Sequence, residues 1–266
     1  MYSKIETEAS KSALLEFSLA LKRYHNDMVL AGGWAPYFIS NKFRPHCGSI
    51  DMDFVLKTKI MEKYEAIVKS VVKLGYEQEN EFRFFKDVPS PVDGKQYSIH
   101  LDFLCDKEGL KYVDVRAVQD GLGAFAFNGS NIAFDFNYEE EISTVLPGNG
   151  KARSTVRVVD IVGSFSLKGQ AIDGRSKPKD FYDIYMLTFF NGSPEKAADY
   201  FNKRVRTTKL APDREKLLKH SLSIVMQRFE DMESMGPYQV EQFTDGEIRR
   251  EEVARQVNEF LEKIKV

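Results

Sequence analysis

The sequence predicts a mixed α/β domain over residues 1–158, followed by an all-helical domain over residues 159–266. Before residue 159, short apolar segments with strand-like alternation are interspersed with helical patterns, and after it the apolar residues recur only with a helical period. The 266 residues are 42% hydrophobic and 29% charged, which is the composition of a folded protein with a real core rather than of a disordered chain.

The first half reads as helices and strands in alternation, and then as a run of strands. Residues 5–25 carry Ile5, Leu14 and Phe17 at helical spacing, which predicts a helix that covers a sheet. The next elements predicted are a strand at 27–31, a helix at 34–41, a strand at 50–56 and a helix at 60–74 that ends at Gly75. Short β-branched or aromatic segments then predict strands at 81–87, 96–105, 111–118, 131–136 and 155–159, and the glycine-rich stretch 121–130 predicts a loop.

The second half has the spacing of amphipathic helices. Pro194 after Ser193 is a typical helix start, because serine caps the first turn and proline suits its first position. The predicted helices lie at 160–172, 179–190, 194–202, 212–232 and 245–264.

The net charge of −2 excludes a strongly basic nucleic-acid-binding protein as a class. Residues 203–209 form the longest basic segment, for which a solvated helix end is the simpler interpretation and contact with RNA the alternative.

Two cysteines, Cys47 and Cys105, show neither a disulfide framework nor a metal motif, which favours a reducing compartment. The first seven residues are polar and lack the apolar core of a signal peptide, and no stretch approaches the apolar length of a membrane span. We therefore expect a cytoplasmic protein without a membrane partner.

The glycine pair Gly32-Gly33 follows an apolar strand segment and precedes a short helical pattern. Backbone N–H groups in such a turn can face phosphate oxygens with no side chain between them. A glycine pair between a strand and a helix is also ordinary turn chemistry, so this pair alone is weak evidence.

Asp51 and Asp53 alternate with Ile50, Met52 and Phe54, so on a strand the two carboxylates share one face. Two adjacent carboxylates repel each other unless a proton or a cation intervenes, and Mg²⁺ is the usual cation beside phosphates. Any exposed strand of a half-buried sheet can show the same pattern. Together with the glycine pair eighteen positions earlier, however, the acid pair indicates a site for a metal-bound nucleotide.

Transfer of a nucleotide with the help of metal ions favours a third acid. Asp102 is our candidate, because it lies in a long alternating segment that is expected to run beside the Asp51 strand. Asp114 and Asp106 are its rivals, and a plain surface strand is the alternative to all three. His100, two residues before Asp102, is either a substrate contact or an ordinary strand residue.

The helical half contains Lys168 inside an otherwise apolar helix, followed by Arg175 just beyond its end and by Asp180 in the next helix. Cations that face a triphosphate would neutralise its charge and that of the leaving pyrophosphate. Solvated lysines and an acid that suits a helix dipole are the simpler interpretation, which we accept for Lys177 and Lys179 but not for Lys168.

Together these residues resemble the AbiEii/AbiGii toxin family, within the DNA polymerase β-like nucleotidyltransferase superfamily. The resemblance rests on two blocks, Leu30-Ala31-Gly32-Gly33-Trp34-Ala35 leading to Ser49-Ile50-Asp51-Met52-Asp53-Phe54, and Lys168-x-x-Ala171 with Arg175, Lys179-Asp180 and Tyr182-Asp183. It implies a mixed-sheet nucleotidyltransferase domain, a helical domain, and transfer of a nucleoside monophosphate from an NTP with loss of pyrophosphate.

The resemblance also implies roles for single residues. Metal, as Mg²⁺ or Mn²⁺, would be held by Asp51, Asp53 and Asp102, and these acids with Lys168 would form the catalytic set. The nucleotide would be bound by Gly32, Gly33, Ser49, Lys168, Arg175 and Asp180. The implied partners are an NTP, an acceptor that is RNA, tRNA, a protein or a small molecule, and an antitoxin protein, because members are often toxins of toxin–antitoxin or phage-defence pairs.

One position departs from the family pattern. Members commonly carry an arginine two positions before the serine or threonine of the acid block, and this chain has Cys47 there. Either Arg44 substitutes for it or the contact with the acceptor differs. Two other functions remain as alternatives: an antibiotic nucleotidyltransferase with a small hydroxylated acceptor, and a catalytically silent nucleotide-binding protein.

Overall fold

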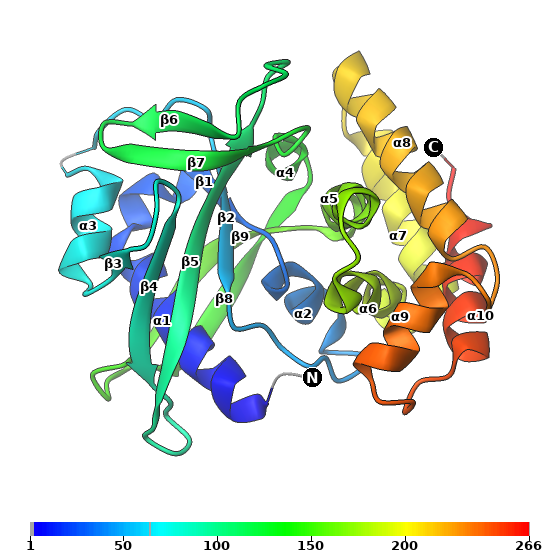
Figure 1. The fold of residues 1–266 in the computed structure, drawn as a ribbon, viewed down its shortest axis with the longest axis horizontal. Coiled ribbons are helices and arrows are strands. Elements are labelled where there is room, and N and C mark those ends of the chain that lie inside the picture. The colour runs from blue at the N-terminus through cyan, green and yellow to red at the C-terminus, as the bar shows by residue number, and fades with distance from the viewer. Residues whose placement is uncertain (1–2, 64, 266) are drawn as a thin grey trace. The chain divides into compact units, whose positions relative to one another are not determined.

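A nine-stranded mixed sheet is the largest element of the computed structural model, which describes residues 3–63 and 65–265. Along the sheet the strands follow the order β3-β4-β5-β2-β1-β9-β8, and β7 adds to β5 and carries β6 (Figure 1). The strands are β1 (Met28–Leu30), β2 (Met52–Leu56), β3 (Glu77–Gln78), β4 (Arg83–Pro89), β5 (Gln96–Asp106), β6 (Val115–Gln119), β7 (Leu122–Phe127), β8 (Asn137–Val145) and β9 (Lys151–Val159).

The other regular elements of the described structure are helices. They are α1 (Lys4–Ala20), α2 (Trp34–Ser40), α3 (Ile67–Lys73), α4 (Ile132–Asp135), α5 (Ile161–Gly174), α6 (Pro178–Leu187), α7 (Pro194–Thr207), α8 (Pro212–Arg228), α9 (Met235–Phe243) and α10 (Arg250–Leu261), with 3₁₀ turns at Lys22–Asp27 and Phe190–Gly192. Among these, none is both long enough and apolar enough to cross a membrane.

The contacts divide the chain into two compact units. We call residues 3–34 and 47–159 the sheet unit, and residues 35–46 and 160–265 the helical unit. The helical unit therefore takes most of α2 from the first half of the chain.

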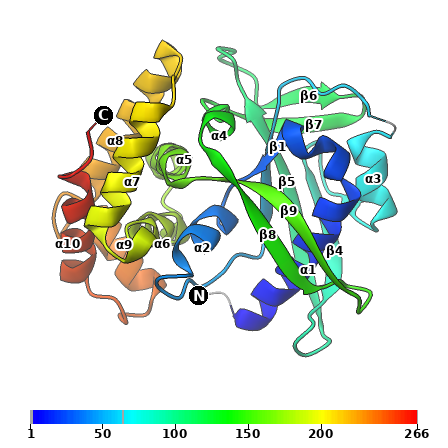
Figure 2. The same ribbon diagram turned by 180° about the vertical axis from the view of Figure 1, so that it is seen from behind.

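In the sheet unit, α1 packs across one face of the sheet against β4, β5, β8 and β9 (Figure 2). Its stripe of apolar residues ends at Phe17, whose ring lies 4.7 Å from that of Phe54 and 6.3 Å from that of Phe103. All three side chains are almost completely buried. Burial of such aromatic area is the main stabilising term of the unit and confirms the covering helix that the sequence predicts.

In the helical unit, α5 packs against α6 and α8, and α6 against α9. Phe165 on α5 stacks on Phe260 of α10, with ring centroids 4.6 Å apart and an interplanar angle of 7°. Asp160 caps α5, since its carboxylate accepts hydrogen bonds from the N–H groups of Val162 and Gly163. Ser193 caps α7 in the same way, through the N–H of Lys196, as its sequence context indicates.

The prediction of a helix from residue 60 is wrong for its first part. Helix α3 begins only at Ile67, because the preceding backbone is bonded elsewhere. The N–H of Ile60 donates to the carbonyl of Val118, and that of Ile67 to the side chain of Gln119. Contacts with β6, which the local pattern does not reveal, thus override helix propensity.

The segment 121–136 also differs from the prediction. The predicted glycine-rich loop contains strand β7, which forms a hairpin with β6 and buries Leu122, Ala124 and Ala126. The predicted strand at 131–136 is instead the short helix α4, in which the carbonyls of Ala133 and Phe134 accept hydrogen bonds from the Asn137 side chain.

Strand β8 is missing from the prediction, and β9 starts four residues before the predicted strand. The two strands pair over nine residue positions, from Asn137 opposite Val159 to Val145 opposite Lys151. Three consecutive glutamates, at 139–141, conceal β8 in the sequence, since glutamate has low strand propensity.

Near the C-terminus, the predicted helix 245–264 is α10, which begins only at Arg250. Asp245 and Gly246 have φ values of +51° and +80°, which no helix accommodates. Helix α9, which precedes this turn, is not in the prediction.

Candidate functional site

The glycine turn and the acid pair meet in the sheet unit. Gly32 has φ of +57°, and a Cβ atom at this position would overlap the carboxylate of Asp53. The adjacent N–H of Ala31 donates to the carbonyl oxygen of Asp53, with N and O 2.8 Å apart. Glycine suits this position because it adopts a positive φ and has no Cβ to meet the carboxylate. The turn that includes Gly33 therefore lies directly against Asp53.

The third predicted acid lies beside the second. Strands β2 and β5 run parallel, and their register places Asp53 opposite Asp102. Neighbouring strands are about 4.8 Å apart, so the two side chains project side by side from one face of the sheet. We call Asp51, Asp53 and Asp102 the carboxylate row.

Arg83 is part of this site, although its sequence context does not point to it. It lies on β4 opposite Asp102 and binds that carboxylate through two hydrogen bonds, Nε to Oδ1 and Nη2 to Oδ2, both 2.6 Å. The hydrogen bond to Asp102 raises the pKa of Arg83 further above its ordinary value, against the opposing effect of burial. The guanidinium of Arg83 therefore stays charged at neutral pH.

The alternating pattern predicts a strand over residues 50–56 that includes Asp51. That start is wrong, because β2 begins at Met52 and Asp51 lies just before it. One of its carboxylate oxygens is 3.5 Å from Nδ1 of His100, which lies two residues before Asp102 on β5. The hydroxyl of Ser49 donates to the carbonyl oxygen of Asp51 over 3.3 Å, and Ser49 is buried. The Ser49 hydrogen bond holds the backbone that carries the first acid, and His100 approaches its side chain.

The carboxylate row is not a closed metal site as it stands. Within residues 3–63 and 65–265, no group of three or more histidine, cysteine, aspartate or glutamate side chains is arranged to hold a metal ion. Arg83 occupies both oxygens of Asp102, whereas the Asp51 side chain is 35% exposed. The carboxylate oxygens of Asp51 and Asp53 suit a hard divalent cation. The Asp102 carboxylate differs from the predicted third ligand because both of its oxygens bind Arg83.

The predicted basic residues of the second block lie in the helical unit, in a group that we call the buried ion cluster. Nζ of Lys168 is 2.7 Å from a carboxylate oxygen of Asp180 and 2.6 Å from one of Asp183. Lys179 donates to Asp183 over 2.8 Å, and Nε2 of His46 lies 3.1 Å from the same side chain. These ion pairs offset the free-energy cost of removing the charged groups from water.

Burial governs the ionisation of the cluster. It lowers the pKa of His46 to about 4, despite the hydrogen bond to Asp183, so the ring is neutral at pH 7. Burial opposes the charge on Lys168, but Asp180 and Asp183 outweigh it and raise the pKa of this ammonium. The pKa of Asp183 is likewise lowered, because Lys168 and Lys179 outweigh the effect of burial.

Sequence comparison places this geometry in a known family. The family model described as nucleotidyl transferase AbiEii toxin, of type IV toxin–antitoxin systems, matches residues 13–265. The chain belongs to this family. It is a nucleotidyltransferase, and enzymes of this class generally use divalent metal ions.

Other comparisons add little detail to the AbiEii assignment. No curated protein matches the chain. Two solved structures from Helicobacter pylori are similar: JHP933, with 14% identity, a TM-score of 0.43 and coverage of 98% of this chain and 92% of that one, and a protein described as a candidate nucleotidyltransferase, with 12% identity, a TM-score of 0.38 and 92% coverage of each chain. The assignment therefore rests on the sequence match.

The charged residues of the second block of the AbiEii resemblance pair with one another in the helical unit. The guanidinium of Arg175 binds Asp180 over 2.8 Å, and its side chain remains 58% exposed, whereas Lys168 is 10% exposed. Lys179, interpreted above as a solvated lysine, is buried, and that interpretation is wrong. The predicted contact of Lys168, Arg175 and Asp180 with a nucleotide stays a prediction.

The departure from the AbiEii pattern at Cys47 is not resolved by Arg44. That guanidinium lies 3.1 Å from Glu252 and stacks on Phe189, 4.4 Å from the ring centroid. Arg44 is thus committed to the helical unit. Arg83, in contrast, binds Asp102 of the carboxylate row.

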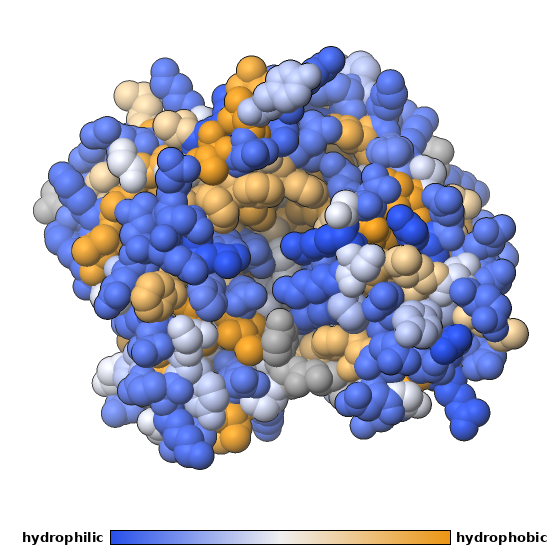
Figure 3. Space-filling view, viewed as in Figure 1, coloured by the Kyte–Doolittle hydropathy of each residue, from blue (hydrophilic) through white to orange (hydrophobic). Residues whose placement is uncertain are grey.

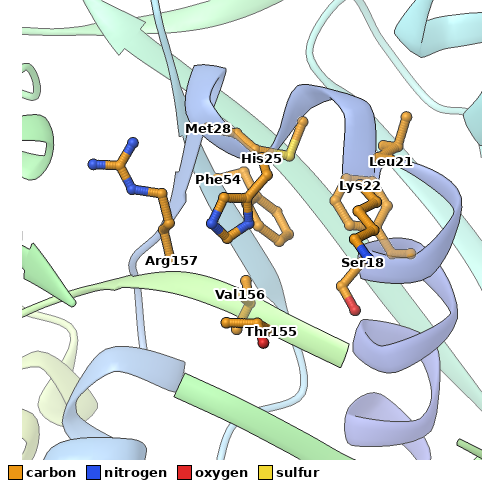
Figure 4. A pocket seen from close by; sticks show the side chains of 10 residues that line it. Ser18, Leu21, Lys22, His25, Met28, Phe54, Thr155, Val156 and Arg157 are labelled. Atoms are coloured by element: carbon orange, nitrogen blue, oxygen red, sulfur yellow. The ribbon is translucent and has the colours of Figure 1, made fainter. Parts of the chain in front are cut away.

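Two further hollows lie outside the acid site. The first, in the sheet unit between the α1 region and β9, has a volume of about 20 Å³, which is room for one water molecule, and Lys22, His25 and Arg157 lie at its margin (Figure 4). The second is a shallow hollow of about 430 Å³ on the helical unit, lined by Asn191, Lys196, Asp199, Tyr200 and Lys203. The basic segment 203–209 begins there, but its Arg204 pairs with buried Asp160 over 2.7 Å.

The surface gives no simple indication of a partner. Figure 3 shows a largely hydrophilic face interrupted by apolar patches. Exposed large apolar side chains include Met61 and Tyr112 on the sheet unit and Met226 and Met235 on the helical unit.

Proposed function

We propose that this AbiEii-family protein transfers a nucleoside monophosphate from an NTP to an RNA, tRNA or protein acceptor, in a reaction that depends on Mg²⁺ or Mn²⁺. An acceptor oxygen forms a bond to the α-phosphorus, the bond from that phosphorus to the bridging oxygen breaks, and pyrophosphate leaves with its electron pair. The hydroxyl proton passes to solvent or to a carboxylate of the row.

The observation that carries this proposal is the contact between the glycine turn and the acid pair. A Cβ at Gly32 would overlap the Asp53 carboxylate. The backbone of the turn, whose N–H groups can donate to a phosphate, therefore lies next to carboxylate oxygens that suit a cation. A turn or an exposed strand without function has no need of this close approach.

The residues of the sheet unit divide the work. Asp51 and Asp53 hold the divalent cation, and the turn at Gly32 and Gly33 faces the phosphates. Ser49 supports the acid pair through the Asp51 carbonyl. When bound, the cation offsets phosphate charge and eases loss of the hydroxyl proton. Asp102, the predicted third ligand, is held by Arg83, and we assign the cation to the other two acids.

The family description also points to a protein partner. Membership in a type IV toxin–antitoxin family supports an antitoxin encoded with this chain, and transfer to RNA or protein would explain toxicity. We expect the cytoplasm as the compartment of both.

The test is incubation of the pure protein with each α-labelled NTP and Mg²⁺, offering total RNA, tRNA, a protein mixture, aminoglycosides or no acceptor. We expect label in an RNA or protein lane that disappears with EDTA. Parallel reactions with γ-labelled NTP should stay unlabelled, because the γ-phosphate leaves with pyrophosphate.

Each other outcome has a meaning. Label only on aminoglycosides would assign the antibiotic class instead. Label from the γ position would show phosphoryl transfer. The absence of label with every NTP and acceptor, while NTP binding persists, would identify a silent nucleotide-binding protein and overturn the proposal.

A further inference from the structure

Arg83 has the geometry of a residue that serves a ligand as well as its partner. Its hydrogen bonds to Asp102 use Nε and Nη2, and within the described part of the chain no residue accepts a hydrogen bond from Nη1. The Arg83 side chain is 38% exposed, and that of Asp102 is 10% exposed. The buried carboxylate therefore orients the guanidinium, and the remaining N–H groups of the guanidinium are available to another acceptor.

The position of Arg83 relates it to the proposed cation site. Register places Asp53, Asp102 and Arg83 on three neighbouring strands, β2, β5 and β4. Two strand spacings, roughly 10 Å, separate the backbones of Asp53 and Arg83. Long side chains shorten this separation, so one phosphate chain can contact both ends of the row.

The ion pair between Arg83 and Asp102 favours a single divalent cation at the row. A second cation at Asp102 would have to displace a bidentate arginine, whose two charge-assisted hydrogen bonds are among the stronger kinds in proteins.

We propose that Arg83 is a phosphate-binding residue and that Asp102 is its positioning residue, so that the carboxylate row holds one divalent cation, at Asp51 and Asp53. This inference rests on the proposed function, and it names the group that binds the phosphate chain in the sheet unit. Arginine suits the task because its planar fork binds carboxylate and phosphate together.

The test measures binding without turnover. Mn²⁺ is titrated alone, and inorganic tripolyphosphate is titrated at saturating Mn²⁺, into the full-length protein and its variants by calorimetry. We expect one Mn²⁺ per chain. Arg83→Gln should bind Mn²⁺ at least as tightly, because Asp102 is released beside Asp53, but tripolyphosphate about 10-fold more weakly or worse. A purely structural role would not move the two affinities in opposite directions.

Three further variants sharpen the result. Arg83→Lys should recover part of the tripolyphosphate affinity, since charge returns without the fork. Asp102→Asn should keep one Mn²⁺ per chain while weakening tripolyphosphate binding, and combined with Arg83→Gln it should add no further loss. Arg116→Gln is the matched control, because Arg116 is also ion-paired on a strand of the sheet unit, to Glu108. Thermal unfolding confirms that each variant is folded.

The outcomes separate the inference from the function on which it rests. Loss of the Mn²⁺ site in Asp102→Asn, or equal tripolyphosphate affinity in folded Arg83→Gln, would overturn the inference alone. Failure of the unmodified protein to bind Mn²⁺ or tripolyphosphate would count against the proposed function itself.

Discussion

Acids and cations lie together in both units, under opposite conditions. In the sheet unit, the Asp51 side chain is 35% exposed and approaches one histidine at 3.5 Å. In the helical unit, the Asp183 side chain is fully buried and contacts Lys168, Lys179 and His46. A partly exposed acid with few partners can exchange them for a cation and a phosphate, whereas a buried acid with three partners stabilises the fold. The comparison predicts that mutations will affect activity in one group and stability in the other.

The largest effect is expected at the acid pair. Asp53→Asn, like Asp51→Asn, should lower metal-dependent transfer of labelled nucleotide by more than about 1,000-fold, because the cation loses a charged ligand. The unfolding free energy should stay level or rise, since repulsion within the row decreases. Asp114→Asn is the control, with an 86% exposed side chain, and should keep full activity. Unchanged transfer by either acid-pair variant would remove these acids from the site.

Next comes Lys168 in the buried ion cluster. Lys168→Ala leaves Asp180 and Asp183 with less compensation in a buried place, and should cost about 3–5 kcal/mol of unfolding free energy. Urea denaturation measures this cost. Lys219→Ala removes an exposed helix lysine paired with Glu215 and should have a far smaller effect. A stable Lys168→Ala protein with weakened NTP binding would reverse our comparison and support the predicted nucleotide contact.

His46 gives a pH-dependent test of the same cluster. Its pKa is about 4 when folded and about 6.5 when unfolded, so the unfolded state binds more protons between these values. Stability contributed by neutral His46 is complete above pH 6.5 and is lost as the pH falls toward 4, by up to about 3 kcal/mol. His46→Gln should flatten this part of the curve of unfolding free energy against pH, while His220→Gln, at an exposed position of α8, should not. Parallel curves for all three proteins would contradict the buried neutral histidine.

The smallest expected effect is the difference between two glycine variants, which separates backbone conformation from close approach. Gly32 and Gly94 both have positive φ, +57° and +71°, but a Cβ at Gly94 would meet nothing within 4 Å. Each alanine variant should lose about 1–2 kcal/mol for its backbone. Gly32→Ala should lose about 1–3 kcal/mol more, because Asp53 must move, and should also lose activity. Equal losses in urea denaturation would mean that the turn and the acid do not need to touch.

Local patterns predict a strand well where burial follows strand periodicity, as at β5. They fail where pairing with strands distant in sequence determines the local structure. The glutamates of β8 and the glycines beside β7 conceal strands that pair only because neighbouring strands are present. The boundary predicted at residue 158 stays a prediction about domains, although the contacts also divide the chain between Val159 and Asp160 and assign residues 35–46 to the helical unit.

The candidate site shows the same limit. Alternation along β5 identifies Asp102, but its pairing with Arg83 depends on the register between β4 and β5. Similarly, the isolated position of Lys168 in an apolar helix indicates an unusual lysine, and only the packing of α5 on α6 shows that Asp180 and Asp183 neutralise it. Sequence spacing reveals which residues share an element, not which elements meet.

By itself, the sequence determined the chemistry available to this protein: a glycine pair, two alternating acids, a third acid and a lysine in an apolar helix, together with membership in the AbiEii family. The tertiary structure decided which partners these groups have and how deeply they are buried. Strand register placed Arg83 on Asp102 and left Asp51 partly exposed, and helix packing enclosed Lys168 between two carboxylates. The physical reason is that strength of pairing and degree of burial are properties of contacts between elements, and both decide whether a charge binds a ligand or stabilises the fold.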